Sequence, residues 1–163
     1  MSVSVALALG SNVGDTVTNL GEAVRRLFAG PELAFARSSS VYRTPPWGIL
    51  DQAEFANAVV LGSTSLQPRA LLAFVKGIEA AMGRTAGVRW GPRLIDIDVI
   101  DMDGVALDTP TLTLPHPRMH ERAFVLVPLA EIAPDRIVAG RRVADAARSV
   151  ETGPVIAAPL SPR

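Results

Sequence analysis

The 163-residue sequence predicts an α+β fold of the split βαβ type, in which helices pack mainly on one face of an antiparallel sheet. Two observations lead to this fold class. Segments with helical periodicity separate most of the strand-like segments, and the second and third strand-like segments follow each other without a helix. The missing helix disfavours the alternative, a doubly wound parallel sheet. A hairpin and further helices are expected after the last strand.

The first half of the chain predicts three strands and two helices. The strands are expected where apolar runs lie between turn residues, at 2–9, 33–42 and 55–61. An apolar stripe over 17–28 predicts a helix that Asp15 or Thr16 caps. Pro68 opens a second helix, and Gly83 ends it.

The second half predicts one more long strand, at 94–102. The dipeptide Asp103-Gly104 is a hairpin turn signal and leads into a short strand at 105–107. Residues 121–132 are expected to be partly helical, and Pro128 is expected to kink or divide that helix.

Composition restricts the class of protein. Sixteen basic and sixteen acidic residues give a net charge of zero, which argues against a broad nucleic-acid-binding surface. Without cysteine the chain has no disulfide framework, zinc–thiolate site or thiol nucleophile. Neither a membrane span nor a signal peptide is expected from the apolar runs, so a cytoplasmic protein is predicted. Residues 1–151 are predicted to form one domain, with a loosely ordered tail at 152–163.

The strongest local signal is a pair of aspartates that follows two arginines, Arg89 and Arg93. On a strand Asp96 and Asp98 share a face, about 6.7 Å apart along the backbone. Two like charges at that separation repel by about 2–3 kcal/mol, a cost that a divalent cation removes. Oxygen ligands suit Mg²⁺, and arginine forks suit phosphate, so the segment favours a metal–triphosphate site. A solvated edge strand with two exposed aspartates is the alternative.

Several other residues have both a functional and a structural interpretation. His116 and His120 have the spacing of zinc ligands, but Pro117 between them disfavours a zinc site, and a phosphate contact suits His116 better. Asn57 lies among apolar residues, where its amide bonds either a heterocycle or the backbone. The excess of arginine over lysine reflects either GC-rich coding or phosphate binding. Three aromatic residues serve either as packing or as stacking surfaces, namely Trp47, Phe55 and Phe124.

Taken together, these motifs resemble the 6-hydroxymethyl-7,8-dihydropterin pyrophosphokinases of folate biosynthesis, from Val5 to about Asp135. The resemblance implies a ferredoxin-like α+β fold. It also implies transfer of pyrophosphate from ATP to the pterin hydroxymethyl group, with release of AMP. The motifs that carry it are Leu9-Gly10-Ser11-Asn12, Tyr42-Arg43-Thr44-Pro45-Pro46, Phe55-Ala56-Asn57-Ala58-Val59, Arg89-Trp90-Gly91-Pro92-Arg93, Asp96-Ile97-Asp98 and Pro115-His116 with Arg122-Ala123-Phe124.

The resemblance also implies roles for individual residues. Asp96 and Asp98 would bind two Mg²⁺ ions, and with Arg84 and Arg93 they would form the catalytic set. The remaining expected ATP contacts are Glu79, Arg89, Trp90, Val99, His116 and Arg122. The expected pterin contacts are Thr44, Pro45, Pro46, Trp47, Phe55, Asn57 and Phe124. The implied partners are ATP and the reduced pterin, with no nucleic acid and no membrane, and the protein is expected to be a monomer.

Two departures from the family pattern affect these expectations. Members commonly carry a second basic residue shortly after the position of Arg84, and Thr85-Ala86-Gly87-Val88 offers none. Arg118 is a candidate replacement. The position of Phe55 is often tyrosine, so here a hydroxyl is missing while the stacking plane remains.

Three other functions are weighed against this one. A non-catalytic nucleotide or pterin sensor would not require two magnesium ligands. An RNA-binding domain would require a basic surround for its aromatic residues, which the neutral charge speaks against. A different magnesium phosphotransferase would leave the Pro-Pro segment and Asn57 without a purpose.

Overall fold

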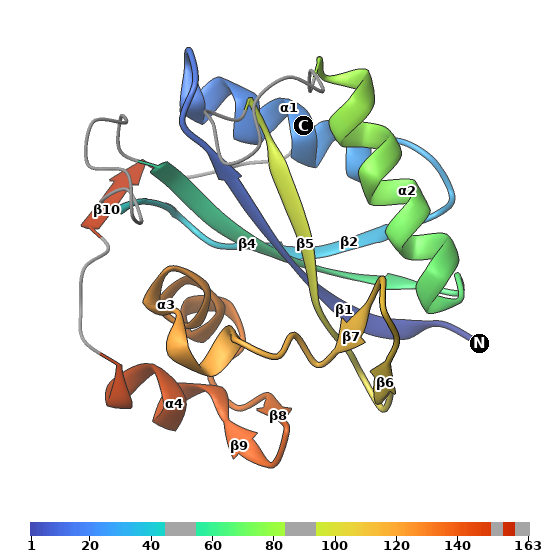
Figure 1. Ribbon diagram of the computed structural model, residues 1–163. Helices are drawn as coiled ribbons and strands as arrows, with labels where there is room; N and C mark the ends of the chain where they lie inside the picture. The colour runs from blue at the N-terminus through green and yellow to red at the C-terminus, as the bar shows by residue number, and fades with distance from the viewer. Residues whose placement is uncertain (45–54, 84–93, 151–154, 159–163) are drawn as a thin grey trace.

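A computed structural model describes residues 1–44, 55–83, 94–150 and 155–158. Its centre is a six-stranded antiparallel sheet in the order β10-β3-β4-β1-β5, with β2 also pairing with β4 (Figure 1). The strands are β1 (Val3–Ser11), β2 (Ala34–Ser38), β3 (Val41–Thr44), β4 (Phe55–Thr64), β5 (Asp96–Met102) and β10 (Val155–Ala158). The α+β class with an antiparallel sheet is therefore confirmed.

The segment predicted as one strand at 33–42 is two strands, β2 and β3, which pair with different parts of β4. The interruption falls at Ser39, whose backbone N–H donates to the carbonyl of Val59 at 2.9 Å. The Ser39 hydroxyl oxygen accepts the Val59 N–H, also at 2.9 Å, in place of a backbone carbonyl. A side chain that substitutes for the backbone ends the regular ladder.

The two helices predicted in the first half are confirmed, as α1 (Thr16–Leu27) and α2 (Pro68–Ala81). The carboxylate of Asp15 accepts the N–H of Thr18 at 3.1 Å and so caps α1. Pro68 occupies the first turn of α2, and Gly83 follows that helix with a φ of +91°, a conformation that favours glycine. Both helices cover the same face of the sheet, over Val5, Leu7 and Leu9 of β1.

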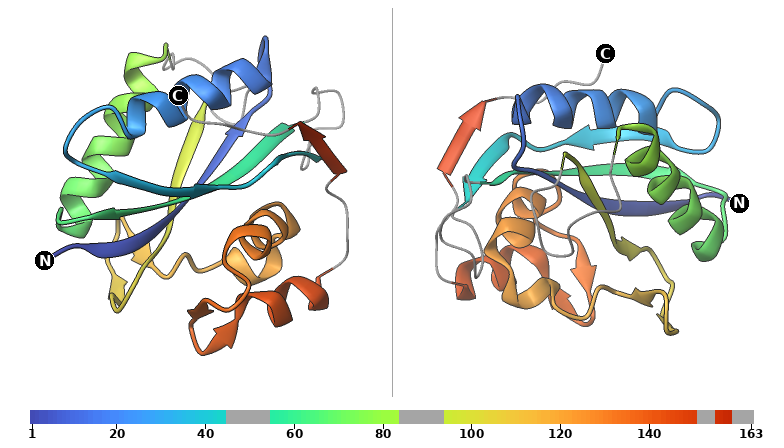
Figure 2. Two further views of the ribbon diagram at one scale, coloured as in Figure 1. Left: turned by 180° about the vertical axis from the view of Figure 1, so that it is seen from behind. Right: turned by 45° about the horizontal axis from the view of Figure 1, so that its top comes forward.

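The opposite face is covered by α3 (Ala123–Ile132) and α4 (Val143–Ser149), as Figure 1 and Figure 2 show. The sequence analysis assigned no face of the sheet to these C-terminal helices, and the structure places them opposite α1 and α2. Ala6 of β1 belongs to this second core, together with buried α3 residues such as Leu126 and Leu129. Small side chains on this face of β1 leave room for an apolar helix to pack closely.

The C-terminal part differs from prediction in three further details. Helix α3 runs through Pro128 without division. The segment after the turn at Gly104 forms β6 (Leu107–Asp108), which pairs with β7 (Thr113–Leu114) and not with β5. Strand β10 lies inside the expected loose tail and pairs with β3, so that part of the tail belongs to the sheet.

A second short hairpin joins β8 (Ile137–Val138) to β9 (Arg141–Arg142). No helix in the described ranges has the length and apolar character needed to cross a bilayer.

Candidate active site

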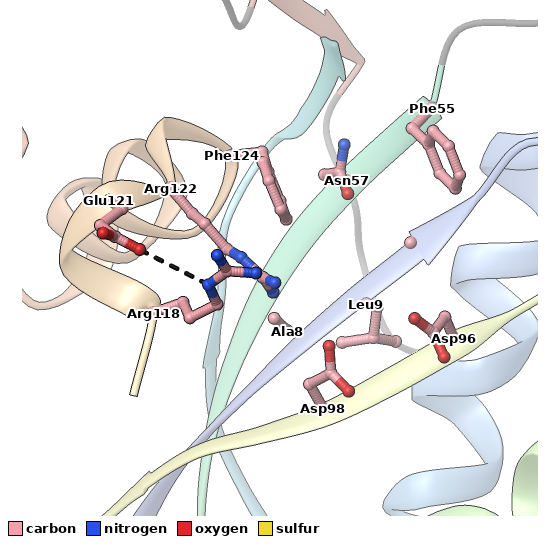
Figure 3. A pocket seen from close by; sticks show the side chains of 11 residues that line it. Ala8, Leu9, Phe55, Asn57, Asp96, Asp98, Arg118, Glu121, Arg122 and Phe124 are labelled. Atoms are coloured by element: carbon pink, nitrogen blue, oxygen red, sulfur yellow. Dashed lines mark ion pairs between the residues drawn. The ribbon is translucent and has the colours of Figure 1, made fainter. Parts of the chain in front are cut away.

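A pocket of about 510 Å³ lies between the sheet and the segment that leads into α3 (Figure 3). Strands β1, β4 and β5 form its floor, and the chain from Arg118 to Phe124 forms one side. Most of the described residues that sequence analysis assigned to the pterin or to metal therefore meet here. The lining residues are Ala8, Leu9, Gly10, Phe55, Asn57, Asp96, Asp98, Arg118, Glu121, Arg122 and Phe124.

Two aromatic rings and one amide form the apolar end of this pocket. Figure 3 shows Asn57 between Phe55, at the start of β4, and Phe124, in the first turn of α3. Asn57 is buried, with only 6% of its surface exposed. A β-carbon placed on Gly10 would lie 3.1 Å from the amide oxygen of Asn57, so glycine at that position gives the amide its space. The arrangement suits a flat heterocycle with polar edges.

Two carboxylates form the polar end of the pocket. Asp96 and Asp98 share a face of β5, opposite Gly10 and Ala8 of β1 in the strand register. Because these β1 residues are small, neither covers the carboxylates with a large side chain. The alternation predicted for this strand is confirmed. β5 is an edge strand, as the alternative held, but its two aspartates are half-buried on the wall of a pocket instead of fully exposed.

The electrostatics of the pair favour a bound cation. Burial and then the neighbouring Asp96 raise the pKa of Asp98 to about 6, against partial compensation by Lys76 and Arg122. A divalent cation would relieve this repulsion. Within the described residues no group of three or more His, Cys, Asp or Glu side chains is arranged for a metal. Two carboxylates with water and phosphate as further ligands match the preference of Mg²⁺.

A second pocket of about 310 Å³ lies between α2, β5 and the segment 109–117. Asp98 lines both pockets, so its carboxylate stands at their junction. Two of the expected ATP contacts line this second pocket, namely Val99 and His116.

His116 is fixed in position by two backbone hydrogen bonds. Its own N–H donates to the carbonyl of Ile100 in β5 at 2.8 Å, and its ring Nδ1 accepts the N–H of Arg118 at 3.2 Å. Burial, followed by the charges of Arg122 and Arg118, lowers the pKa of His116. The ring is therefore neutral at pH 7, with its hydrogen on Nε2, where it can donate to a phosphate oxygen.

Glu79, expected as an ATP contact, lies behind the pockets rather than lining either of them. Its side chain is 1% exposed and accepts the backbone N–H of Ile97 at 2.8 Å, between the two aspartates. Lys76 donates to the same carboxylate at 2.8 Å and to the Ile97 carbonyl at 3.1 Å. Within the described contacts, Glu79 thus joins α2 to the strand that carries the aspartates.

Seven predicted site residues lie outside the described residues, and an eighth is described by its backbone alone. Thr44 ends β3 and pairs with Phe55 in the register of β3 with β4. The seven are Pro45, Pro46, Trp47, Arg84, Arg89, Trp90 and Arg93.

Two charged residues that line the pockets, Lys76 and Glu121, were not among the predicted site residues. Lys76 is the single lysine of the chain, and only its place one turn before Glu79 could have indicated it. Arg118, the candidate replacement for the missing basic residue, lines the first pocket beside Glu121. Neither Lys76, on α2, nor Glu121, shortly before α3, belongs to one of the motifs that predicted the site, so neither was assigned a role.

Comparison with known proteins gives a consistent result. The 7,8-dihydro-6-hydroxymethylpterin-pyrophosphokinase family matches residues 6–134 of this chain. A 2-amino-4-hydroxy-6-hydroxymethyldihydropteridine pyrophosphokinase of Methylorubrum extorquens is 51% identical over 140 residues, which cover 86% of this chain and 89% of that protein. An enzyme of the same name from Bacillus subtilis is 48% identical over 126 residues, 77% of this chain and 75% of that protein.

Solved structures show the same fold at low identity. A crystal structure of an HPPK-DHPS protein in complex with substrates superposes with a TM-score of 0.71 at 15% identity. Plasmodium falciparum HPPK-DHPS with pteroate gives a TM-score of 0.74 at 14% identity. Each match covers 91% of this chain but only 43% and 42% of the longer proteins, so it concerns one part of each.

Proposed function

This chain belongs to the 7,8-dihydro-6-hydroxymethylpterin-pyrophosphokinase family, and from that premise we infer that it transfers pyrophosphate from ATP to hydroxymethyldihydropterin in folate biosynthesis. The hydroxymethyl oxygen forms a bond to the β-phosphorus of ATP. The bond from that phosphorus to the oxygen bridging the α-phosphate breaks, and AMP leaves with the bridging oxygen. The hydroxyl proton passes to solvent. ATP is thus the co-substrate of the reaction.

The pocket between Phe55 and Phe124 is the proposed acceptor site. The two rings offer planes on which a pterin can stack, and the amide of Asn57 offers a donor and an acceptor for its edge. The guanidinium of Arg122 lies 5.5 Å from the centre of the Phe124 ring, which holds that arginine beside the acceptor. Stacking in this pocket would place the hydroxymethyl group toward the aspartates at its polar end.

Asp96 and Asp98 are the proposed ligands of Mg²⁺. Their geometry and the raised pKa of Asp98 fit a cation held by oxygen ligands alone. When bound, Mg²⁺ would neutralise phosphate charge and orient the reacting groups. Two ions are proposed, because the pair of carboxylates could hold one ion beside the polyphosphate and another beside the acceptor.

The second pocket is the proposed donor site. His116 presents its Nε2 hydrogen, and Arg122 and Lys76 supply positive charge near Asp98. Arg84, Arg89 and Arg93 are proposed as further phosphate contacts. Phosphoryl transfer depends mainly on positioning and charge stabilisation, so these groups can act without a covalent intermediate.

The single observation that carries the proposal is the place of Asp98 on the wall of both pockets. A group transferred from one pocket to the other must pass this carboxylate. The test is to mix the protein with ATP, Mg²⁺ and the reduced hydroxymethylpterin and to identify the nucleotide product by chromatography. AMP is expected, and Asp98→Asn should remove it. ADP would indicate an ordinary kinase, and no product would favour a binding protein.

A monomer of one domain is proposed, in which β10 completes the sheet. Light scattering of the eluted protein should then give a mass near 17.2 kDa. A mass near twice that value would contradict the monomer.

A further inference from the structure

Arg118 lies at the edge of the acceptor pocket on the segment between His116 and the short 3₁₀ helix η1 (Met119–Glu121). Its side chain is 69% exposed. Figure 3 shows Arg118 and Arg122 extending from this segment toward β1, on the side of the pocket where Asp98 lies. The function proposed above gives a role to Arg122 and none to Arg118.

In the free protein Arg118 is paired with Glu121. Its Nε lies 3.6 Å from the Glu121 carboxylate, whose side chain is 72% exposed. A pair this long and this well solvated is weak, because water screens both charges. An anion that binds the guanidinium with better geometry can therefore displace Glu121 at little cost.

The pocket that Arg118 lines indicates which ligand this side chain would contact. Arg118 and Glu121 line the acceptor pocket and not the donor pocket, whereas His116 lines the donor pocket and not the acceptor pocket. Asp98, which lines both, marks the boundary between them. A positively charged side chain on the acceptor side, such as Arg118, would contact the transferred phosphates once they are attached to the pterin.

We propose that Arg118 binds the pyrophosphate ester of the product and that Glu121 holds this arginine when no product is bound. The proposal rests on the function inferred above. The planar guanidinium can bond two phosphate oxygens at once, in exchange for a single long contact with a carboxylate. Arg118 would thereby stabilise the product complex more than the ATP complex.

The test is calorimetric binding of the chemically prepared dihydropterin pyrophosphate, with Mg²⁺, to the wild type and three variants. Arg118→Gln should weaken binding roughly threefold to tenfold, the range expected for one charge-assisted contact at a partly exposed site. Glu121→Gln should tighten it, because the competing carboxylate is gone. The matched control is Arg148→Gln, since Arg148 is 70% exposed, pairs with Asp145 three residues away, and lines neither pocket. This control should bind the product as the wild type does.

Two further ligands isolate the phosphate contact. The pterin without phosphate should bind Arg118→Gln and wild type alike, and so should a non-hydrolysable ATP analogue. Product affinity should also depend less steeply on salt in Arg118→Gln, because one ionic contact is missing. Equal product affinity in wild type and Arg118→Gln, or an equal loss for the ATP analogue, would overturn the inference.

The same measurements separate this inference from the proposed function. If the wild type forms AMP and binds the product, but Arg118→Gln binds it equally well, only the role of Arg118 is wrong. If the wild type forms no AMP and fails to bind the product, the proposed function is wrong and the inference falls with it.

Discussion

Replacing Asp98 by asparagine should stabilise the ligand-free protein while it abolishes turnover. The carboxylate is half-buried beside Asp96, and loss of hydration together with the neighbouring charge raises its pKa from 3.8 to about 6. The ionised side chain therefore destabilises the folded protein as long as no cation is bound to it. Asparagine has nearly the same shape without the charge, so the folded state no longer carries that cost.

The size of the effect follows from the pKa shift. A shift from 3.8 to about 6 corresponds to about 3 kcal/mol, since one pKa unit is about 1.4 kcal/mol. The pKa of this carboxyl is higher in the folded state than in the unfolded state. The protonated carboxyl below pH ~4 therefore costs no stability, and the folded wild type loses stability as the carboxyl ionises between pH ~4 and about 6. The advantage of the asparagine variant should therefore be absent at pH 4 and complete at pH 8. At about 2–4 °C per kcal/mol, the melting temperature should rise by about 6–12 °C at pH 8.

Thermal unfolding in EDTA at both pH values measures this difference. Asp103→Asn is the control, because Asp103 is exposed in the turn that follows the same strand and should change little. Excess Mg²⁺ should raise the melting temperature of the wild type and leave that of Asp98→Asn unchanged. A variant no more stable than wild type at pH 8, or a gain that persists at pH 4, would refute the reasoning.

Three further predictions concern the ions, the pocket and the second core. Between pH 6 and 4 the Mg²⁺ affinity measured by calorimetry should fall about tenfold per pH unit, because protons compete for the raised-pKa carboxyl of Asp98; a pH-independent affinity would contradict this. Gly10→Ala should raise KM for the pterin with little effect on KM for ATP, since the new methyl group would displace the Asn57 amide 3.1 Å away; an unchanged pterin KM in steady-state kinetics would contradict the proposed edge contact. Arg136→Met should cost about 3–5 kcal/mol in urea unfolding, because it leaves the buried Asp101 without its partner at 3.0 Å; adding Asp101→Asn should recover part of the loss, and a loss below 1 kcal/mol would argue against the buried pair.

Local patterns in the sequence were sufficient to predict much of the fold. The cap at Asp15, the proline that opens α2 and the shared face of Asp96 and Asp98 all depend on residues close together in the chain. Each of these predictions is confirmed. Each rests on a short-range rule of geometry, which tertiary contacts did not override here.

Features that depend on distant partners were not predicted. The position of α3 on the second face depends on space above Ala6, far away in the chain. The division between β2 and β3 depends on Ser39 bonding Val59, and β10 depends on the free side of β3. Periodicity indicates that a segment is buried, but it does not indicate what covers it.

The site shows the same division. Residues in motifs, such as Asn57 and His116, could be assigned through the family resemblance, and both line a pocket. Arg118 could be named only as a candidate replacement for a missing basic residue, and the sequence did not indicate which pocket it lines. The relation between the two pockets depends on how three strands and the segment before α3 pack together, which no local pattern in the sequence specifies.

The most direct test of the central claim is anomalous diffraction from crystals soaked with Mn²⁺ in place of Mg²⁺, together with a non-hydrolysable ATP analogue and the pterin. The account predicts two anomalous peaks within bonding distance of the Asp96 and Asp98 carboxylates, at the junction of the two pockets. Peaks elsewhere, or carboxylates without a metal in fully occupied substrate complexes, would contradict it.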